Sequence, residues 1–508
     1  MSFIPKMGLS KSKYTTFCCC PKKLWLSTYH PEYGVVSEAS KRNFERGNQV
    51  GDLAMGLLGP FEEVTTFEVG DKGKLDYAAM IKKTKDCMNR DVENICEASF
   101  SFEGNYCAVD ILHKVGDGYA IYEVKSTTDS DDGKDEMLCY AEDIAYQKYV
   151  LENCGLNIVG VYLVRINHDY VLGEELDVFQ LFSIKDMSEL VAAESVKIAQ
   201  NIKNARNTLS RDVEPDIGIG RYCEKPYECN FHGRCFNFLP TLSIFDFYNS
   251  KKKWKYIEDG KFALADIRNE KMSAAQKIVV EGLLDNKPHI DKAGIQTFLT
   301  KMHYPLYFFD FESMMSAIPQ FKGTKPYQQV CFQYSLHIVK SPGTEPEHRE
   351  FLAESGEDPL RKIAENICKD IPKGACMVVY NAGFEKGRIK ELAQMFPDLA
   401  DHLLGTIEDV VDLLDLFRAG HYYLPAMGSC FSVKSVLPAL FPDDPELDYH
   451  NLEGVHRGDE AADIFPKIKD MPPEEAARTR QNLLDYCKLD TYAMVKIVNK
   501  LNEVVQGG

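Results

Sequence analysis

Hydrophobic and polar residues alternate in a strand pattern in the first half of the chain. Residues 106–112 and 119–124 are two alternating runs separated by a Gly-Asp-Gly sequence, and such a turn between alternating runs predicts a β-hairpin. Residues 135–152 instead place apolar side chains at steps of three and four, which predicts an amphipathic helix. A second helix is predicted over residues 187–209.

The pattern changes near residue 240 and again near residue 300. The segment between these positions is expected to be helical and contains a lysine-rich run at residues 251–255. An α/β pattern then starts at residue 306, with strands predicted near 306–312, 327–338 and 377–380. We therefore expect an α/β protein with one domain over residues 1–240, a helical lysine-rich bridge over 241–300 and a second domain over 301–508.

The composition is that of an acidic globular protein. The 508 residues include 59 Lys and Arg against 77 Asp and Glu, which gives a net charge of −18. This charge argues against broad coating of nucleic acid or anionic membranes, although it leaves room for a local basic groove. The sequence has no apolar run of 18 residues and no charged-then-apolar leader, so we expect a cytoplasmic protein that does not enter membranes.

Three charged residues of the predicted hairpin suggest a catalytic site. Asp110 lies in its first strand, and Glu123 and Lys125 share one face of its second strand because side chains alternate along a strand. Two acids and a lysine suit Mg²⁺-assisted phosphodiester hydrolysis, in which the ion binds oxygen ligands and keeps waters. The helix residue Gln147 and the earlier acid Glu97 are placed to join them. The alternatives are a solvated strand edge and, for Gln147, a core or surface glutamine.

Cysteine spacing suggests a metal centre. The chain has 16 cysteines, and in a reducing compartment clustered cysteines indicate a metal site or buried thiols rather than disulfides. Residues 18–20 are three consecutive cysteines, and Cys223, Cys229 and Cys235 follow at equal steps of six. Four thiolates are what a [4Fe–4S] cluster needs, whereas zinc knuckles use shorter spacings. Spacing alone leaves a cluster, zinc and buried thiols open.

A pair of acids begins the second half of the chain. Residues 306–312 are apolar except for Asp310 and Glu312, which share one face of the predicted strand. Two carboxylates that project together from a buried strand repel each other, and a bound cation would remove this repulsion. The alternative is a strand end that opens to solvent, with both acids simply exposed.

Two later segments extend this acidic set. Glu385 lies where the predicted strand at 377–380 passes into a helix. Tyr486 and Asp490 are four residues apart and therefore share one face of a helix. The chain has no Walker loop and no glycine-rich phosphate cradle, so ATP-driven movement along nucleic acid is not expected.

In the N-terminal half, Asp110, the Glu123-Val124-Lys125 strand and Gln147 resemble the PD-(D/E)XK nucleases of the RecB clan. The segment that begins Cys20-Pro21-Lys22-Lys23, together with the three later cysteines, is similar to the iron–sulfur members of that clan, such as the CRISPR-adaptation exonuclease. The resemblance covers about residues 10–240 and implies a restriction-endonuclease-like fold that binds Mg²⁺ or Mn²⁺ through Asp110 and Glu123. It also implies a [4Fe–4S] clasp held by Cys20, Cys223, Cys229 and Cys235. Gly51 stands where many relatives have a metal-binding histidine.

In the C-terminal half, Asp310-Phe311-Glu312, residues 381–385 and the pair Tyr486 and Asp490 resemble the three motifs of DnaQ-like DEDD exonucleases, tyrosine subtype, which have an RNase H-like fold. The resemblance covers about residues 301–508. More specifically, this half looks like the uncharacterised DEDD-like domain fused to iron–sulfur RecB-clan nucleases in bacteria. It implies that two Mg²⁺ or Mn²⁺ ions are bound by Asp310, Glu312, Glu385 and Asp490, and that Tyr486 contacts the attacking water. Glu385 replaces the aspartate of the family.

These features predict a metal-dependent nuclease with two candidate sites, most simply an exonuclease, that degrades or trims DNA or RNA. DNA is the favoured substrate, and repair, recombination or defence is the expected setting. The alternative is a non-catalytic protein that binds nucleic acid or organises a complex through degenerate sites. Gly51 and Glu385 are the departures that favour this alternative.

Overall fold

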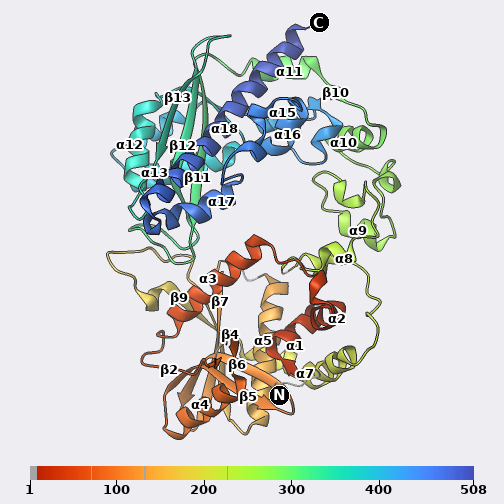
Figure 1. Cartoon of the computed structure of the whole chain (residues 1–508), viewed down its shortest axis with the longest axis vertical. Coiled ribbons are helices and arrows are strands. Elements are labelled where there is room, and N and C mark those ends of the chain that lie inside the picture. The colour runs from red at the N-terminus through yellow and green to blue at the C-terminus, as the bar shows by residue number, and fades with distance from the viewer. Residues whose placement is uncertain (1–7, 70, 131–132, 226, 508) are drawn as a thin grey trace. The chain divides into compact units, whose positions relative to one another are not determined.

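The chain folds into two compact α/β units. The computed structural model describes residues 8–69, 71–130, 133–225 and 227–507 (Figure 1). Unit 1 consists of Met1–Phe238 and Ser316–Tyr327, and unit 2 consists of Leu239–Met315 and Gln328–Gly508. The mixed α/β class agrees with the sequence pattern. Residues 241–300, expected as a separate bridge, belong to unit 2.

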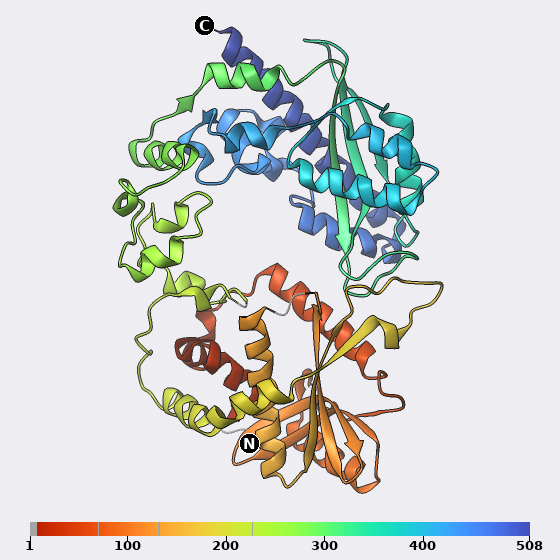
Figure 2. The same cartoon turned by 180° about the vertical axis from the view of Figure 1, so that it is seen from behind.

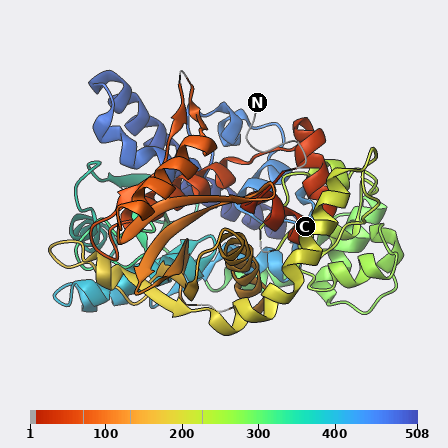
Figure 3. The ribbon, with the colours of Figure 1, turned by 90° about the horizontal axis from the view of Figure 1, so that it is seen from below.

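Unit 1 is a strongly twisted sheet with helices packed on it. Its strands are β1 (Leu9–Ser10), β2 (Glu62–Glu63), β3 (Phe67–Glu68), β4 (Asp71–Leu75), β5 (Asn94–Phe102), β6 (Asn105–Val115), β7 (Gly118–Thr128), β8 (Ile158–Ile166) and β9 (Phe182–Asp186). Its helices are α1 (Lys11–Cys19), α2 (Pro21–Tyr29), α3 (Glu38–Ala54), α4 (Tyr77–Asn89), α5 (Lys134–Asn153), α6 (Val178–Leu181), α7 (Ser188–Leu209) and α8 (His232–Cys235). Figure 3 shows β5, β6 and β7 as curved orange ribbons.

The main sheet of unit 1 has the order β2-β5-β6-β7-β8-β9, and β1 pairs with β6 beside this path. The predicted hairpin is confirmed, because β6 and β7 are antiparallel and Val115 pairs with Gly118 across the turn. The predicted helices over 135–152 and 187–209 are confirmed as α5 and α7. Helix α5 lies across the strands of the hairpin and faces the side chains of one sheet surface.

Unit 2 has a sheet with helices on both faces. Its strands are β10 (His289–Ile290), β11 (Leu306–Met315), β12 (Gln329–Val339), β13 (Glu347–Leu352), β14 (Cys376–Val379), β15 (Val410–Asp412) and β16 (Tyr422–Tyr423). Its helices are α9 (Lys253–Glu258), α10 (Ala274–Asp285), α11 (Lys292–Leu299), α12 (Leu360–Asp370), α13 (Ala382–Met395), α14 (Ala400–Thr406), α15 (Leu413–Arg418), α16 (Val433–Leu440), α17 (Gly458–Ile464) and α18 (Pro473–Gln506). Among all the helices described in both units, none is long and apolar enough to cross a membrane.

The five-stranded sheet of unit 2 has the order β13-β12-β11-β14-β15. Strand β12 is antiparallel to both β13 and β11, whereas β14 runs parallel to both β11 and β15. Successive residues of β12 contact helices on opposite faces: Tyr334 donates to Asp370 of α12 at 2.7 Å, and Gln333 donates to the Leu483 carbonyl of α18 at 2.8 Å. Figure 2 shows the same two layers of helices from behind.

Polar side chains of β12 hold α18 in register along the sheet. Gln333, Ser335 and His337 are buried on the face that α18 covers. The Ser335 hydroxyl and the His337 ring contact the Thr491 hydroxyl at 2.7 and 2.8 Å. These bonds satisfy groups that would be costly to bury unpaired, and they fix the rotation of α18 on both sides of residues 486–490.

A segment between β11 and β12 completes the fold of unit 1. The backbones of Leu172 and residues 323–324 exchange two hydrogen bonds, of 2.8 and 3.0 Å. The Tyr327 hydroxyl donates to the carbonyl of Ser126, which directly follows Lys125 in β7. The Arg46 guanidinium of α3 lies 5.6 Å from the Tyr327 ring centroid. Residues 316–327 are therefore a structural part of unit 1, although β11 and β12 belong to unit 2.

We expect Tyr327→Phe to lower the free energy of opening of unit 1 by about 1 kcal/mol, because it removes one hydrogen bond. Tyr327→Ala should cost about 2 kcal/mol or more, because the ring packing is also lost. Native-state hydrogen exchange, resolved by segment, measures this change in unit 1. The matched control is Lys322→Ala, since Lys322 is 65% exposed and should change stability by less than about 0.5 kcal/mol. Equal effects of the two alanine variants would contradict the assignment.

Candidate active sites

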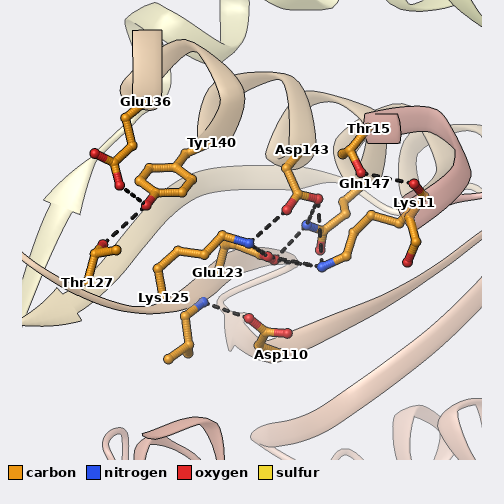
Figure 4. Close-up of polar contacts among 12 residues, drawn as sticks. Lys11, Thr15, Asp110, Glu123, Lys125, Thr127, Glu136, Tyr140, Asp143 and Gln147 are labelled. Atoms are coloured by element: carbon orange, nitrogen blue, oxygen red, sulfur yellow. Dashed lines mark hydrogen bonds and ion pairs between the residues drawn. The ribbon is translucent and has the colours of Figure 1, made fainter. Parts of the chain in front are cut away.

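The hairpin of unit 1 and helix α5 bring charged side chains together. Glu123 and Lys125 project from one face of β7 toward α5, which supplies Asp143 and Gln147 (Figure 4). The Lys125 ammonium lies 2.6 Å from Glu123 Oε1 and 2.9 Å from Asp143 Oδ2. The Gln147 amide donates to Glu123 Oε2 at 2.7 Å. Glu123 and Gln147 are buried, so the solvated-edge and surface-glutamine alternatives do not hold for them.

Lys11 joins this group from the start of α1. Its ammonium lies 3.0 and 3.2 Å from the two Glu123 oxygens and 3.7 Å from Asp143 Oδ1. Strand β1, immediately before Lys11, pairs with β6 and so fixes this position. Sequence reasoning did not identify Lys11 or Asp143. Asp143 could have been found from its four-residue spacing to Gln147, whereas nothing in the local pattern marks Lys11.

Asp110 and Glu97 form a second part of the site, where positive charge offsets the carboxylates less completely. Asp110 Oδ2 accepts a hydrogen bond of 2.6 Å from the Val124 backbone. The pairing of β5 with β6 continues on both sides of Glu97, so Glu97 falls opposite Asp110 in the register. At Glu97 the backbone adopts a φ of 55° and the ladder is interrupted. Directly opposed carboxylates are unfavourable, so this pair is suited to holding a cation.

The acids of unit 1 differ in pKa because they differ in their contacts with lysines. Burial would raise the pKa of Glu123, but Lys11 and Lys125 outweigh it and hold that pKa well below its usual range. Burial, then the charge of Glu123, raises the pKa of Asp110 to about 6. Burial, then Asp110, raises the pKa of Glu97 to about 7. Glu123 is therefore ionised and already paired with two lysines. The negative charge of Asp110 and Glu97 is offset less completely.

The four cysteines expected to bind a cluster line one cavity in unit 1. Cys20 is the residue between α1 and α2, and Cys235 ends α8. Cys223 and Cys229 are linked through a backbone hydrogen bond of 2.8 Å, and all four side chains face the same cavity. Burial raises the pKa of the Cys223 thiol to about 11 and raises those of Cys20 and Cys235 as well. The four thiols are therefore gathered at one place in unit 1.

The spacing of these sulfur atoms is wider than a zinc site requires. Tetrahedral Zn–S bonds of about 2.3 Å would place the sulfur atoms roughly 3.8 Å apart. Among the described residues, which include all four cysteines, no three of their sulfur atoms lie within 4.8 Å of one another. Iron–sulfur clusters are larger, because each thiolate binds a different iron of the cube.

The acids of unit 2 converge on a cavity of about 270 Å³. Asp310 and Glu312 project into it from β11, and Asp490 and Tyr486 from α18. Donor atoms of Asp310, Glu312 and the buried Cys487 of α18 all lie within 4.8 Å of one another. Glu312 and Asp490 are buried, with exposures of 7% and 8%, which contradicts the solvent-exposed alternative. The sequence-predicted carboxylates therefore meet from elements far apart in the chain.

Glu385 lies in the first turn of α13 and is 2% exposed. Its carboxylate adds to the negative charge around Asp310, and its Oε2 atom is buried without a hydrogen-bond partner. An ionised oxygen of this kind is costly to bury alone. Asp310, Glu312 and Asp490 line the cavity and Glu385 lies close to Asp310 outside that lining. Carboxylate oxygens in this arrangement fit a divalent cation.

Lys434 lines the cavity and Tyr449 contacts Asp490, and neither residue was found from the sequence. The Lys434 ammonium of α16 donates to the Tyr486 hydroxyl at 3.0 Å and to the His456 carbonyl at 2.9 Å. The Tyr449 hydroxyl donates to Asp490 Oδ1 at 2.6 Å. Both come from irregular or short elements, which carry no periodic signal. Within the described part of the chain, no ion pair within 4.0 Å involves the four acids, Asp310, Glu312, Glu385 and Asp490.

Burial is the main cause of raised carboxyl pKa values in this cavity. It raises the pKa of Glu312 to about 8, with a further contribution from Asp490. It also raises the pKa of Glu385 to about 8 and that of Asp490 to about 6. Burial and the three other acids raise the pKa of Asp310 well above its usual value. Without a cation, the folded protein thus retains protons that the unfolded chain releases.

Part of this second unit matches a known family model. Residues 307–432 match a model described as a domain of unknown function, DUF2779. The chain is also similar to the uncharacterized protein MG366 homolog of Mycoplasma pneumoniae, with 25% identity over 233 residues, 41% of this chain and 34% of the relative. The uncharacterized protein MG366 of Mycoplasma genitalium is 23% identical over 216 residues, 39% and 32% of the two chains. The matched part spans about a third of the length of these relatives.

We expect the metal-free protein to lose stability as the pH rises from about 5 to 8. The unfolded carboxyls ionise near pH 4.5, whereas those of Glu312 and Glu385 ionise near pH 8 in the folded protein. The folded state therefore binds more protons in this window, and the free energy of unfolding falls as they are released. Mn²⁺ should raise the melting temperature more at pH 8 than at pH 5, because it binds the ionised acids.

The variant Asp310→Asn should weaken this Mn²⁺ effect, since it removes a central carboxylate. Asp485→Asn is the matched control, because Asp485 is an exposed acid of the same helix as Asp490 and bonds only to Gln481. Thermal unfolding with and without Mn²⁺ measures both. A pH-independent Mn²⁺ shift that Asp310→Asn leaves unchanged would rule out the cavity as the binding site.

Proposed function

We propose that the chain is a metal-dependent nuclease whose main hydrolytic centre is the acidic cavity of unit 2. The observation that carries this proposal is the convergence of Asp310, Glu312 and Asp490 on one cavity, with the buried carboxylate of Glu385 close to Asp310. The order β13-β12-β11-β14-β15, with helices on both faces, supports an RNase H-like DEDD exonuclease fold for this unit. DNA is the favoured substrate, and RNA offers the same phosphodiester chemistry.

The residues of the cavity have distinct tasks in this proposal. Asp310, Glu312, Glu385 and Asp490 would hold Mg²⁺ or Mn²⁺, which supplies Lewis acidity and a water of lowered pKa. The Tyr486 hydroxyl accepts a hydrogen bond from Lys434 and supports the Asp490 carboxylate, so it would contact a water bound beside that carboxylate. Tyr449 orients Asp490 through its 2.6 Å hydrogen bond.

We further propose that unit 1 is a PD-(D/E)XK-like unit closed by a [4Fe–4S] cluster. The four cysteines that line one cavity support this assignment, and the wide spacing of their sulfur atoms favours a cluster over zinc. Cys20 lies 203 residues before Cys223 in the sequence. A cluster here would act as a structural clasp between the first helices of the unit and its last turns.

The candidate nuclease site of unit 1 has a second interpretation. Lys11, Lys125 and Gln147 together contact both oxygens of Glu123. An ammonium group on these oxygens competes with a metal ion for the same lone pairs. This observation favours a role for unit 1 in binding nucleic acid, with weak hydrolysis of its own through Asp110 and Glu97.

We expect Asp310→Asn to lower Mn²⁺-dependent digestion of end-labelled DNA by about 100-fold or more, because it removes a ligand of the metal. Lys125→Ala should lower it by less than about 10-fold, since the main centre stays intact. Single- and double-stranded DNA and RNA are compared, with Asp485→Asn as the control. A larger loss with Lys125→Ala than with Asp310→Asn would move the main centre to unit 1. Inert wild-type protein that still binds DNA would leave only a binding role.

The cluster makes a separate prediction. Protein purified without oxygen should be brown and contain about four irons per chain. Cys229→Ala should lose the colour and iron, whereas Cys154→Ala should keep both, because Cys154 is exposed and lies outside the cavity. Iron and zinc analysis together with visible absorption provides the measurement. A colourless protein that contains stoichiometric zinc would refute the cluster.

A further inference from the structure

A second group of metal-ligating side chains lies at another edge of the unit 2 sheet. His303 precedes β11, Cys376 begins β14, and Asp409 immediately precedes β15. These strands run parallel with β14 in the middle, and Cys376 pairs with Leu306. The Met377 backbone donates to the Asp409 carbonyl at 2.9 Å. The topology therefore places the three side chains at the starts of three adjacent strands, whereas the acidic cavity uses residues farther along β11.

The three donor groups are close enough to share one ion. A nitrogen of His303, the sulfur of Cys376 and an oxygen of Asp409 all lie within 4.8 Å of one another. The His303 ring contacts the Asp409 carboxylate directly. Tetrahedral Zn²⁺ with bonds of about 2.0–2.3 Å would need donor separations of roughly 3.3–3.8 Å. Movements of about 1 Å or less in two exposed side chains would therefore close the site.

Cys376 is a neutral buried thiol with one contact that favours a thiolate. Cys376 is fully buried, and burial raises the pKa of its thiol, while a hydrogen bond from the His303 backbone opposes that rise. Such an N–H donor stabilises a sulfur that carries negative charge. The side chains of His303 and Asp409 are 59% and 39% exposed. An ion would thus reach the buried sulfur from the solvent side, through two ligands that are free to adjust.

We propose that His303, Cys376 and Asp409 form a binding site for Zn²⁺ or a similar borderline cation. Imidazole, thiolate and carboxylate are the ligands that proteins use for zinc, and water would occupy the fourth position. The imidazole distinguishes this site from the acidic group of Asp310, Glu312 and Cys487, which has no histidine and whose carboxylate oxygens favour Mg²⁺ or Mn²⁺. Binding replaces the thiol proton with the ion and releases that proton to solvent. The ion would tie the residues before β11 to the starts of β14 and β15.

Zinc binding to the whole chain tests this proposal. The protein is purified anaerobically, so that the proposed [4Fe–4S] cluster occupies the cysteine cavity. Equilibrium dialysis against Zn²⁺ is done in excess Mg²⁺, which fills the oxygen-ligand site. Wild type should take up one more equivalent of zinc than Cys376→Ala. In His303→Ala the affinity should fall by about 100-fold, as loss of one ligand predicts. Because His303 is exposed, this second variant tests the site even where Cys376→Ala fails to fold.

The chain offers a matched control for the surface pair. His450 and Asp448 form another exposed His–Asp contact, at 2.8 Å, and belong to no described group of three ligating residues. His450→Ala should bind zinc as the wild type does. Zinc uptake that His303→Ala leaves unchanged, or that His450→Ala reduces equally, would overturn the proposal. The readout is independent of nuclease activity, so it can fail or succeed separately from the proposed function.

Discussion

A buried carboxylate must meet positive charge, because the interior of a protein solvates an ion poorly, and the two units satisfy this need in different ways. In unit 1, Lys11 and Lys125 meet Glu123 directly, so the protein supplies its own counter-ions. In unit 2, the nearby lysine is bonded to a phenol and a carbonyl instead. The acids there stay protonated or take a cation from solution. This difference makes the unit 2 cavity the better candidate for binding a cation.

The position of α18 is the second requirement of the unit 2 cavity. Its bonds to β12 lie at Leu483 and Thr491, on either side of the two residues that face Asp310. Gln333, Ser335 and His337 thus interrupt a buried strand with polar groups, at a cost that only a matched partner offsets. The geometry of the cavity is set by polar groups of β12 that do not line it. Equivalent support in unit 1 comes from β1, which places Lys11 beside β7.

The sequence predicted those parts of the sites that follow a regular period. Alternation along the hairpin placed Glu123 and Lys125 on one face, and helical spacing paired Tyr486 with Asp490. Lys11 could not be predicted, because its partner Glu123 lies 112 residues away and only tertiary packing joins them. Lys434 likewise depends on how α16 packs. The boundary near residue 240 could be predicted from a change in the hydrophobic pattern. No pattern assigns residues 316–327 to unit 1, because that assignment depends on where the Tyr327 side chain packs.

That short segment has a consequence for how the protein can be taken apart. The chain passes between the units three times, near residues 238, 315 and 327. A single proteolytic cut between residues 240 and 300 would therefore yield two fragments that still adhere, because the second carries twelve residues seated in the first. Expression of residues 1–240 alone would remove residues 316–327 from unit 1 and expose the apolar side chains beside β7 that they cover. Neither half is an independent module, and recombination at a single junction would transfer one unit incomplete.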